Sequence, residues 1–310
     1  MSALRIGAVS YLNTVPLVHE LPRLSPGDEL RLDLPSRLAD QLAAGLLDVA
    51  LIPVIEVALG DDYTIVSDAC IGCCGPVWSV KLLSRRPLRE IRSVALDEGS
   101  RTSVALTKLL LQRRLELRPE YVPLPISSDY RRAETDAVLV IGDRAMHRSA
   151  LKNPGTPPAA PNTPAHSELA RDTSLVRDTS LARDTSLARD TSLEQFPFQV
   201  DLGEAWNEWT GLPFVFAVWA ARPGVDVDRL SQLLSTARDL GLEQTANLAK
   251  SHAYRYDLSV GDCLRYFTEF LNYRLGPREK DAMRLFCRWA AESGLLPHPS
   301  ELKFHGCPVA

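Results

Sequence analysis

The stretch LPSRLADQLAAGLLDVALIPVIEVAL, from Leu34 to Leu59, decides the fold class. Apolar residues at 38–43 recur at helical spacing, and the helix that they predict begins at Ser36 as its N-cap and ends near Gly45. LLDVALIP is then a short, continuous apolar run that ends at Pro53, which is typical of a buried strand. Strand–helix–strand order of this kind predicts an α/β protein with a largely parallel sheet.

The same pattern recurs on both sides of this unit. Short apolar runs at residues 4–9, 94–96, 137–141 and 211–222 predict further buried strands. Helical spacing predominates in the chain beyond them, up to Gly294.

Composition narrows the class of protein. The chain has 310 residues, of which 45% are hydrophobic and 24% charged, as in ordinary globular proteins, and this length suggests two domains. A formal charge of -4 gives no electrostatic reason to expect nucleic acid or a membrane as partner, and no apolar run approaches the roughly 20 residues that span a bilayer. The N-terminal residues read as a first strand and not as a signal peptide, which predicts a cytoplasmic protein whose six cysteines stay thiols.

A repeat interrupts the α/β pattern. The tetrapeptide RDTS begins at residues 171, 177, 183 and 189, after a segment rich in Pro and Ala. A period of six scatters the leucines around a helix, and the array is too short and polar to form a solenoid. We expect residues 151–195 to be a flexible surface insertion.

Four of the predicted strands end in polar, small-residue turns. These turns lie at 10–14, 99–103, 142–143 and 209–211. Ligands of open α/β sheets bind beyond the carboxyl ends of strands, and a helix beginning near Ser100 would offer free N–H groups to a carboxylate or phosphate. Each turn alone could simply cap its own helix, but several in one chain favour a shared cleft. The candidate ligand-binding residues are Ser10, Tyr11, Asn13, Ser100, Thr102, Ser103, Asp143, Thr210 and Gly211.

No motif for a nucleotide, a metal or a nucleophilic serine is present. The phosphate loop GxxxxGK[ST], the dinucleotide fingerprint GxGxxG and the elbow GxSxG are all absent. CIGCC groups Cys70, Cys73 and Cys74, but the other cysteines lack the matching spacing of a second pair. We therefore expect neither a metal site nor a nucleotide cofactor.

Six segments together resemble the chorismate dehydratases of the futalosine route to menaquinone. They are RIGAVSYLNTVPL, PSRLADQLAAGLLDVALIPVIE, CIGCCGPVWSVKLLSR, VALDEGSRTSVALTKLLL, AVLVIGDRAM and DLGEAWNEWTGLPFVFAVW, in family order over most of residues 4–222. The resemblance implies a type 2 periplasmic-binding-protein-like fold, with two lobes, a central cleft and two hinge crossovers. Lobe one would comprise residues 1–83 and 213–310, and lobe two residues 84–212.

The implied reaction removes water from chorismate, the small-molecule substrate, to give 3-[(1-carboxyvinyl)oxy]benzoate, and it requires no metal or organic cofactor. The resemblance makes Asn13 and Ser79 the catalytic candidates and places the Ser100–Ser103 turn on a carboxylate. Asn13 would position the substrate or its leaving hydroxyl, since an amide is a poor base. Glu56, Asp143 or a carboxylate of the substrate could accept the proton, although Glu56 and Asp143 could equally serve as helix caps or inter-lobe contacts. Cys73 and Cys74 stand where the family pattern leads us to expect small polar residues.

Two rival interpretations stay open. The sister enzyme 1,4-dihydroxy-6-naphthoate synthase shares the fold, but its first loop differs from SYLNT. A solute-binding or ligand-sensing protein would hold a small anion without chemistry. The sequence leaves the oligomeric state open.

Overall fold

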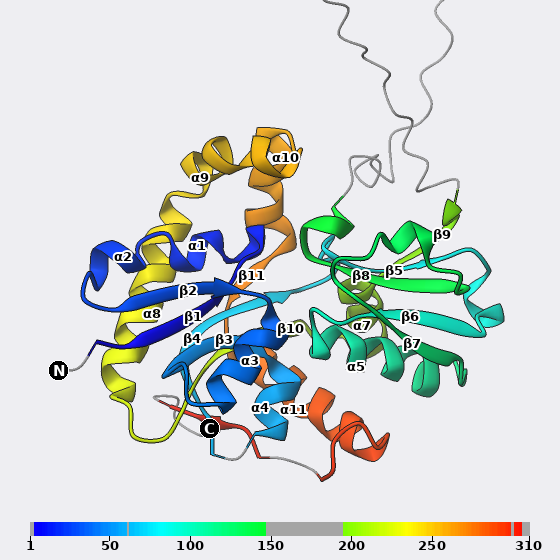
Figure 1. Ribbon diagram of the computed structural model, residues 1–310, viewed down its shortest axis with the longest axis horizontal. Coiled ribbons are helices and arrows are strands. Elements are labelled where there is room, and N and C mark those ends of the chain that lie inside the picture. The colour runs from blue at the N-terminus through cyan, green and yellow to red at the C-terminus, as the bar shows by residue number, and fades with distance from the viewer. Residues whose placement is uncertain (1–2, 61, 147–194, 299–300, 306–310) are drawn as a thin grey trace, which may run out of the picture.

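Two β-sheets form two lobes in the computed structural model, which describes residues 3–60, 62–146, 195–298 and 301–305 (Figure 1). The first sheet belongs to the N-terminal and C-terminal parts of the chain, and the second to the middle. The expected insertion at 151–195 lies outside the described residues except for Gln195.

The sheet of lobe one has seven strands in the order β11-β4-β10-β3-β1-β2, with β12 beside β4. β1 pairs in parallel with β2 and β3, whereas β10 runs antiparallel to both β3 and β4. β3 and β10 are buried along their whole length, as their continuous apolar sequences predict. The strands are β1 (Arg5–Val9), β2 (Glu29–Asp33), β3 (Val49–Pro53), β4 (Thr64–Cys73), β10 (Phe214–Ala221), β11 (Asn272–Arg274) and β12 (Lys303–Phe304).

The sheet of lobe two has five strands in the order β7-β6-β8-β5-β9. β6 is parallel to β7 and β8, and β5 is antiparallel to β8 and β9. The strands are β5 (Val80–Ser84), β6 (Ser93–Asp97), β7 (Glu120–Leu124), β8 (Ala137–Ile141) and β9 (Phe198–Asp201).

Helices cover both sheets, and α11 packs against α4 of lobe one and α5 of lobe two below their junction (Figure 1). Lobe one contains η1 (Leu12–Thr14), α1 (Val15–Val18), α2 (Leu21–Leu24), α3 (Pro35–Ala43), α4 (Val54–Leu59), α8 (Val227–Glu243), α9 (Thr245–His252), η7 (Ala253–Tyr256), α10 (Val260–Arg265), η8 (Tyr266–Phe270) and α11 (Pro277–Glu292). Lobe two contains η2 (Leu88–Glu90), α5 (Arg101–Leu109), η3 (Leu110–Arg114), η4 (Tyr130–Arg132), η5 (Gly142–Ala145) and α7 (Leu202–Thr210).

The chain passes between the sheets twice. The first passage lies between β4 and β5, at residues 74–79, and the second between α7 and β10, at residues 211–213. The first passage comes earlier than the expected boundary after residue 83, because all of β5 pairs within the second sheet.

The unit at 34–59 differs from expectation at one end. Ser36 lies inside α3 and does not cap it; the helix begins at Pro35, and Leu34 is its N-cap without a side-chain bond. Gly45 follows the C-terminus with φ +73°, a conformation that glycine adopts without strain.

Candidate active site

A small cavity lies between the two lobes. Its volume is about 40 Å³. Five polar side chains contribute to its wall, and none of the lining residues is Lys, Arg, His, Asp or Glu. The lining comprises Val9, Tyr11, Asn13, Pro35, Pro53, Ile71, Val77, Ser79, Val80, Ser100, Ser103, Ile141, Gly142, Phe216 and Ala217.

Strand ends bring these residues together. Val9, Pro53 and Ile141 are at the carboxyl ends of β1, β3 and β8, and the turn after β6 leads to Ser100. Carboxyl ends of parallel strands meet at one edge of a sheet, and here the edges of two sheets face each other. The cleft expected from the polar turns is therefore built from both lobes.

Tyr11 and Asn13 enter the cavity from the turn after β1. The Asn13 side-chain oxygen accepts a hydrogen bond from the Thr14 hydroxyl at 3.2 Å, which leaves its NH2 group without a partner among the described residues. The Tyr11 ring lies against Gly142, where an added Cβ would come within 3.0 Å of it. Burial raises the Tyr11 pKa, so the phenol stays protonated and can donate a hydrogen bond.

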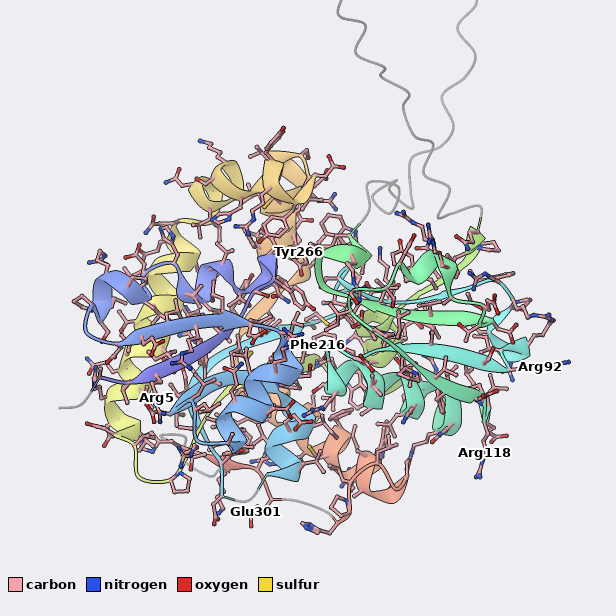
Figure 2. All side chains as sticks on the ribbon, viewed as in Figure 1. Arg5, Arg92, Arg118, Phe216, Tyr266 and Glu301 are labelled. Atoms are coloured by element: carbon pink, nitrogen blue, oxygen red, sulfur yellow. The ribbon has the colours of Figure 1, made fainter. Side chains whose placement is uncertain are left out.

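Ser79 faces the cavity from the first passage between the lobes. Its hydroxyl is buried and has no hydrogen-bond partner among the described residues. Its carbonyl accepts a 2.8 Å bond from the N–H of Gly142, and its side chain lies near the phenol of Tyr266. Figure 2 shows Tyr266 and Phe216 where the two lobes meet. A buried, unpaired hydroxyl beside a cavity is suited to binding a ligand.

Ser100 is both a helix cap and a wall of the cavity. Its hydroxyl accepts bonds from the Ser103 N–H at 3.4 Å and the Ser103 hydroxyl at 3.1 Å, at the first turn of α5. The two interpretations of this turn, a helix cap or a wall of the cleft, therefore both apply to Ser100. Ser100 and Ser103 both line the cavity, so the first turn of α5, where a helix has free N–H groups and the positive end of its dipole, lies beside it.

Phe216 supplies an apolar surface that the polar turns did not predict. The pairing of β10 with β4 shifts register between Val215 and Ala217, so Phe216 is the extra residue of a bulge. Bulges redirect side chains next to functional sites. Together with Val77 and Ile141, Phe216 gives the cavity a face suited to a ring.

Five predicted binding residues lie outside the cavity lining; one of them, Asp143, is described with the carboxylates below. Ser10 is exposed at the end of β1, and the buried Thr102 hydroxyl accepts a bond from the Ile55 N–H at 3.2 Å. The turn of Thr210 and Gly211 ends helix α7 and precedes β10, so the expectation that it follows a strand is wrong. The Thr210 hydroxyl bonds the Trp206 carbonyl, and Gly211 caps the helix with φ +70°.

The two carboxylates expected as possible bases lie close to the cavity without lining it. Asp143 accepts a 3.1 Å bond from the N–H of Leu12, and burial raises its pKa to about 6. Glu56 forms an ion pair of 3.0 Å with Arg101, and burial raises its pKa despite that partner. Both carboxylates bridge the lobes, as the structural alternative predicted.

Two arginines that lie close to the cavity-lining residues Gly142 and Ser100 in the sequence of lobe two are paired with carboxylates. Arg144 forms an ion pair with the fully buried Asp97, and Arg101 also contacts Asp40 at 2.8 Å. An anionic ligand in the cavity would therefore be held by hydroxyl, amide and backbone N–H donors.

The sequence did not predict the role of Asp201, whose carboxylate binds the first passage between the lobes. Its Oδ1 accepts bonds from the N–H groups of Val77, Gly203 and Glu204, and its Oδ2 accepts one from Trp78. The Asp–Leu–Gly–Glu order indicates a helix cap but gives no sign of the contact with residues 77 and 78.

The described part of the chain shows no group of three or more His, Cys, Asp or Glu placed to hold a metal ion. Cys70, Cys73, Cys74, Cys263 and Cys287 are free thiols, and neither Cys73 nor Cys74 lines the cavity. Among the same described residues, no helix is long and apolar enough to cross a bilayer.

Comparison with solved structures identifies the fold. A structural-genomics protein from Archaeoglobus fulgidus matches with a TM-score of 0.68 and 14% identity, over 95% of this chain and 98% of that one. The periplasmic aliphatic sulphonate binding protein SsuA from Escherichia coli matches with a TM-score of 0.57 and 15% identity, over 97% and 95%. The periplasmic-binding-protein-like fold with two lobes is confirmed.

Comparison of sequences identifies the family. A family model described as menaquinone biosynthesis matches residues 4–156 and 183–292. The chorismate dehydratase of Thermus thermophilus is 31% identical over 259 residues, which are 81% of this chain and 82% of that protein. With most of its length matched on both counts, this chain belongs to the menaquinone-biosynthesis family that includes chorismate dehydratase.

Proposed function

We propose that this protein is a chorismate dehydratase, a hydro-lyase that converts chorismate to 3-[(1-carboxyvinyl)oxy]benzoate and water. The observation that carries the proposal is the shared cavity between Asn13, Ser79 and Ser100, which come from three separate turns of two lobes. A family relative with the same activity in its name supports it.

The reaction is an elimination that makes the ring aromatic. The bond from C4 to its hydroxyl breaks, the C3 proton is lost, and the electrons of the C3–H bond form the new ring double bond. Aromatisation makes the overall step favourable, so the protein's task is to orient the ring and assist the departing hydroxyl. Asn13 and Ser79 can donate hydrogen bonds to that hydroxyl, because both have donors without protein partners among the described residues.

The two substrate carboxylates are held without a lining cation. The N-terminus of α5, with the hydroxyl of Ser100, receives one carboxylate through hydrogen bonds and the helix dipole. A carboxylate bound by neutral donors keeps more of its basicity than one paired with arginine.

A carboxylate of the substrate is therefore the proton acceptor that the cavity favours. Tyr11 is the one titratable side chain of the lining, and its raised pKa keeps it protonated. Asp143 and Glu56 are engaged in inter-lobe contacts. On this proposal Asp143→Asn and Glu56→Gln keep most of the turnover, whereas loss of all turnover in either variant would make that residue the base.

The lobes must separate to admit the substrate. The volume of the cavity, about 40 Å³, is far smaller than the roughly 300 Å³ of even a small ligand pocket. The two short passages at 74–79 and 211–213 are the places where the backbone can bend.

The deciding experiment incubates the purified protein with chorismate. We expect the ultraviolet absorbance of an aromatic product and a mass lower by one water. Asn13→Ala is expected to lose turnover while its melting temperature stays close to that of the parent protein, and the exposed Ser10→Ala is the matched control. If chorismate binds and is returned unchanged, the protein is a binding protein, and the proposal fails.

A further inference from the structure

Residues 77–79 form a strained γ-turn at the first passage between the lobes. The Ser79 N–H donates to the Val77 carbonyl at 2.8 Å, and Trp78 between them has φ +65°. A bond from residue i+2 back to residue i, around a centre with positive φ, defines the rare form of the γ-turn. Trp78 is not a glycine, so this conformation is strained and persists only because the surrounding structure holds it.

Asp201 holds the turn from lobe two. Its Oδ2 accepts a 2.6 Å bond from the Trp78 N–H, and its Oδ1 accepts a 2.9 Å bond from the Val77 N–H. Bonds to a carboxylate are roughly twice as strong as those between neutral groups. The same Oδ1 caps α7 through Gly203 and Glu204, which fixes the carboxylate itself.

The turn determines where the Ser79 hydroxyl lies. Ser79 is the next residue after the strained centre, and its carbonyl is bound by Gly142 at 2.8 Å. Its hydroxyl lines the cavity and has no protein partner among the described residues. A relaxed turn would rotate this hydroxyl away from its place in the wall.

We infer that Asp201 is a positioning residue for Ser79: it stabilises the strained turn at Trp78 and so aims the Ser79 hydroxyl at the substrate. The inference rests on the proposed function for its kinetic test, but the tether itself is independent of the reaction.

Asp201→Asn separates the two roles of this side chain. Asparagine is as good an N-cap as aspartate, so its oxygen keeps the bonds to Gly203 and Glu204 and leaves α7 capped. Its NH2 then faces the Trp78 N–H, so the bond to Trp78 is lost while the Val77 N–H keeps its bond to Oδ1. We expect kcat to fall by roughly 10- to 100-fold, with a smaller change in KM.

A double-mutant cycle with Ser79→Ala tests whether the effect passes through Ser79. We expect Asp201→Asn to change kcat by less than about twofold in the Ser79→Ala background. An equal loss in both backgrounds would overturn the inference, because Asp201 would then act elsewhere.

A second cycle tests the backbone strain. Trp78→Gly and Trp78→Ala both remove the indole, but only glycine adopts φ +65° freely. Asp201→Asn is expected to slow the glycine variant less than the alanine variant. The same loss in both would show that strain is not what Asp201 holds.

Hydrogen exchange of the peptide covering residues 74–80 gives a reading without substrate. Asp201→Asn should speed exchange of the Trp78 N–H, and unchanged exchange would contradict the tether. Should the parent protein fail to convert chorismate, the proposed function fails while this measurement still decides the role of Asp201.

Discussion

The N–H of Leu12 in lobe one donates a 3.1 Å hydrogen bond to Oδ1 of Asp143 in lobe two. A second backbone contact between the lobes runs from the Ser36 N–H to the Gly99 carbonyl at 3.2 Å. Both contacts lie beside the cavity, so they hold the closed arrangement of the turns that form its wall. Closing the lobes therefore gains these two hydrogen bonds. It also costs free energy, because it buries the Asp143 carboxylate with a single neutral donor.

Asp143→Asn should raise stability at neutral pH. Burial raises the Asp143 pKa from 3.8 to about 6, so the folded protein binds this proton more tightly than the unfolded chain. The stability that this group contributes is present below pH ~4 and is lost as the pH rises through about 6. A shift of two units corresponds to about 3 kcal/mol. In urea unfolding, the free energy of unfolding of the variant should exceed that of the parent protein at pH 8. This difference should shrink toward pH 4.5. A difference independent of pH would be inconsistent with a titrating Asp143.

Ser100→Asp should separate helix capping from substrate binding. Aspartate caps a helix as well as serine does, so the melting temperature should hold, but its charge faces a substrate carboxylate. We expect KM for chorismate to rise at least tenfold at pH 7.5, and Ser100→Asn, a neutral cap, to raise it much less. Equal KM values for the two variants would mean that no carboxylate binds at this turn.

Gly241→Ala should destabilise lobe one severely. A Cβ at this position in α8 would lie 1.8 Å from the carbonyl oxygen of Pro16, which is backbone and cannot turn aside. Overpacking of this kind costs about 3 kcal/mol, and calorimetry should show a melting temperature lower by about 5–10 °C. Gly261→Ala, whose Cβ meets nothing closer than 3.8 Å, is the control and should melt with the parent protein. A variant at 241 that melts with its control would refute the close packing of α8 on α1.

Deletion of residues 170–193 should leave turnover and melting temperature nearly unchanged. The family model leaves 157–182 unmatched, inside the segment expected to be an insertion. Steady-state kinetics of the shortened chain against the full chain is the measurement. A large fall in kcat would give the repeats a part in the reaction.

The apolar runs were sufficient to predict the buried strands of the sheets. The polar turns predicted only some of the residues that line the cavity. β8 has the bounds expected from Ala137 to Ile141, because a short apolar run between turns has few other solutions. Asn13 and Ser100 follow parallel strands and reach the cavity. Thr210 shows the limit: a small polar residue at a helix end and one at a strand end look alike in sequence, and only the local bond to Trp206 distinguishes them.

Contacts between distant segments could not be read from local patterns. The bulge at Phe216 depends on how β10 pairs with β4, and the γ-turn at Trp78 depends on a carboxylate 123 positions away. Neither leaves a periodicity in its own stretch of chain. Local patterns predict helices and strands, whereas these two features arise only when distant segments of the chain pack together.

Trp78 is attached to one lobe by its backbone and to the other by its ring. The indole packs edge-on against Tyr266 at 5.5 Å and beside Phe270 at 5.6 Å, and it is 3% exposed. Opening the lobes would separate this ring from Tyr266 and Phe270 and expose it to water. The fluorescence of Trp78 should therefore report the movement of the lobes. Its emission should shift to longer wavelength when they open and back to shorter wavelength when a ligand closes them.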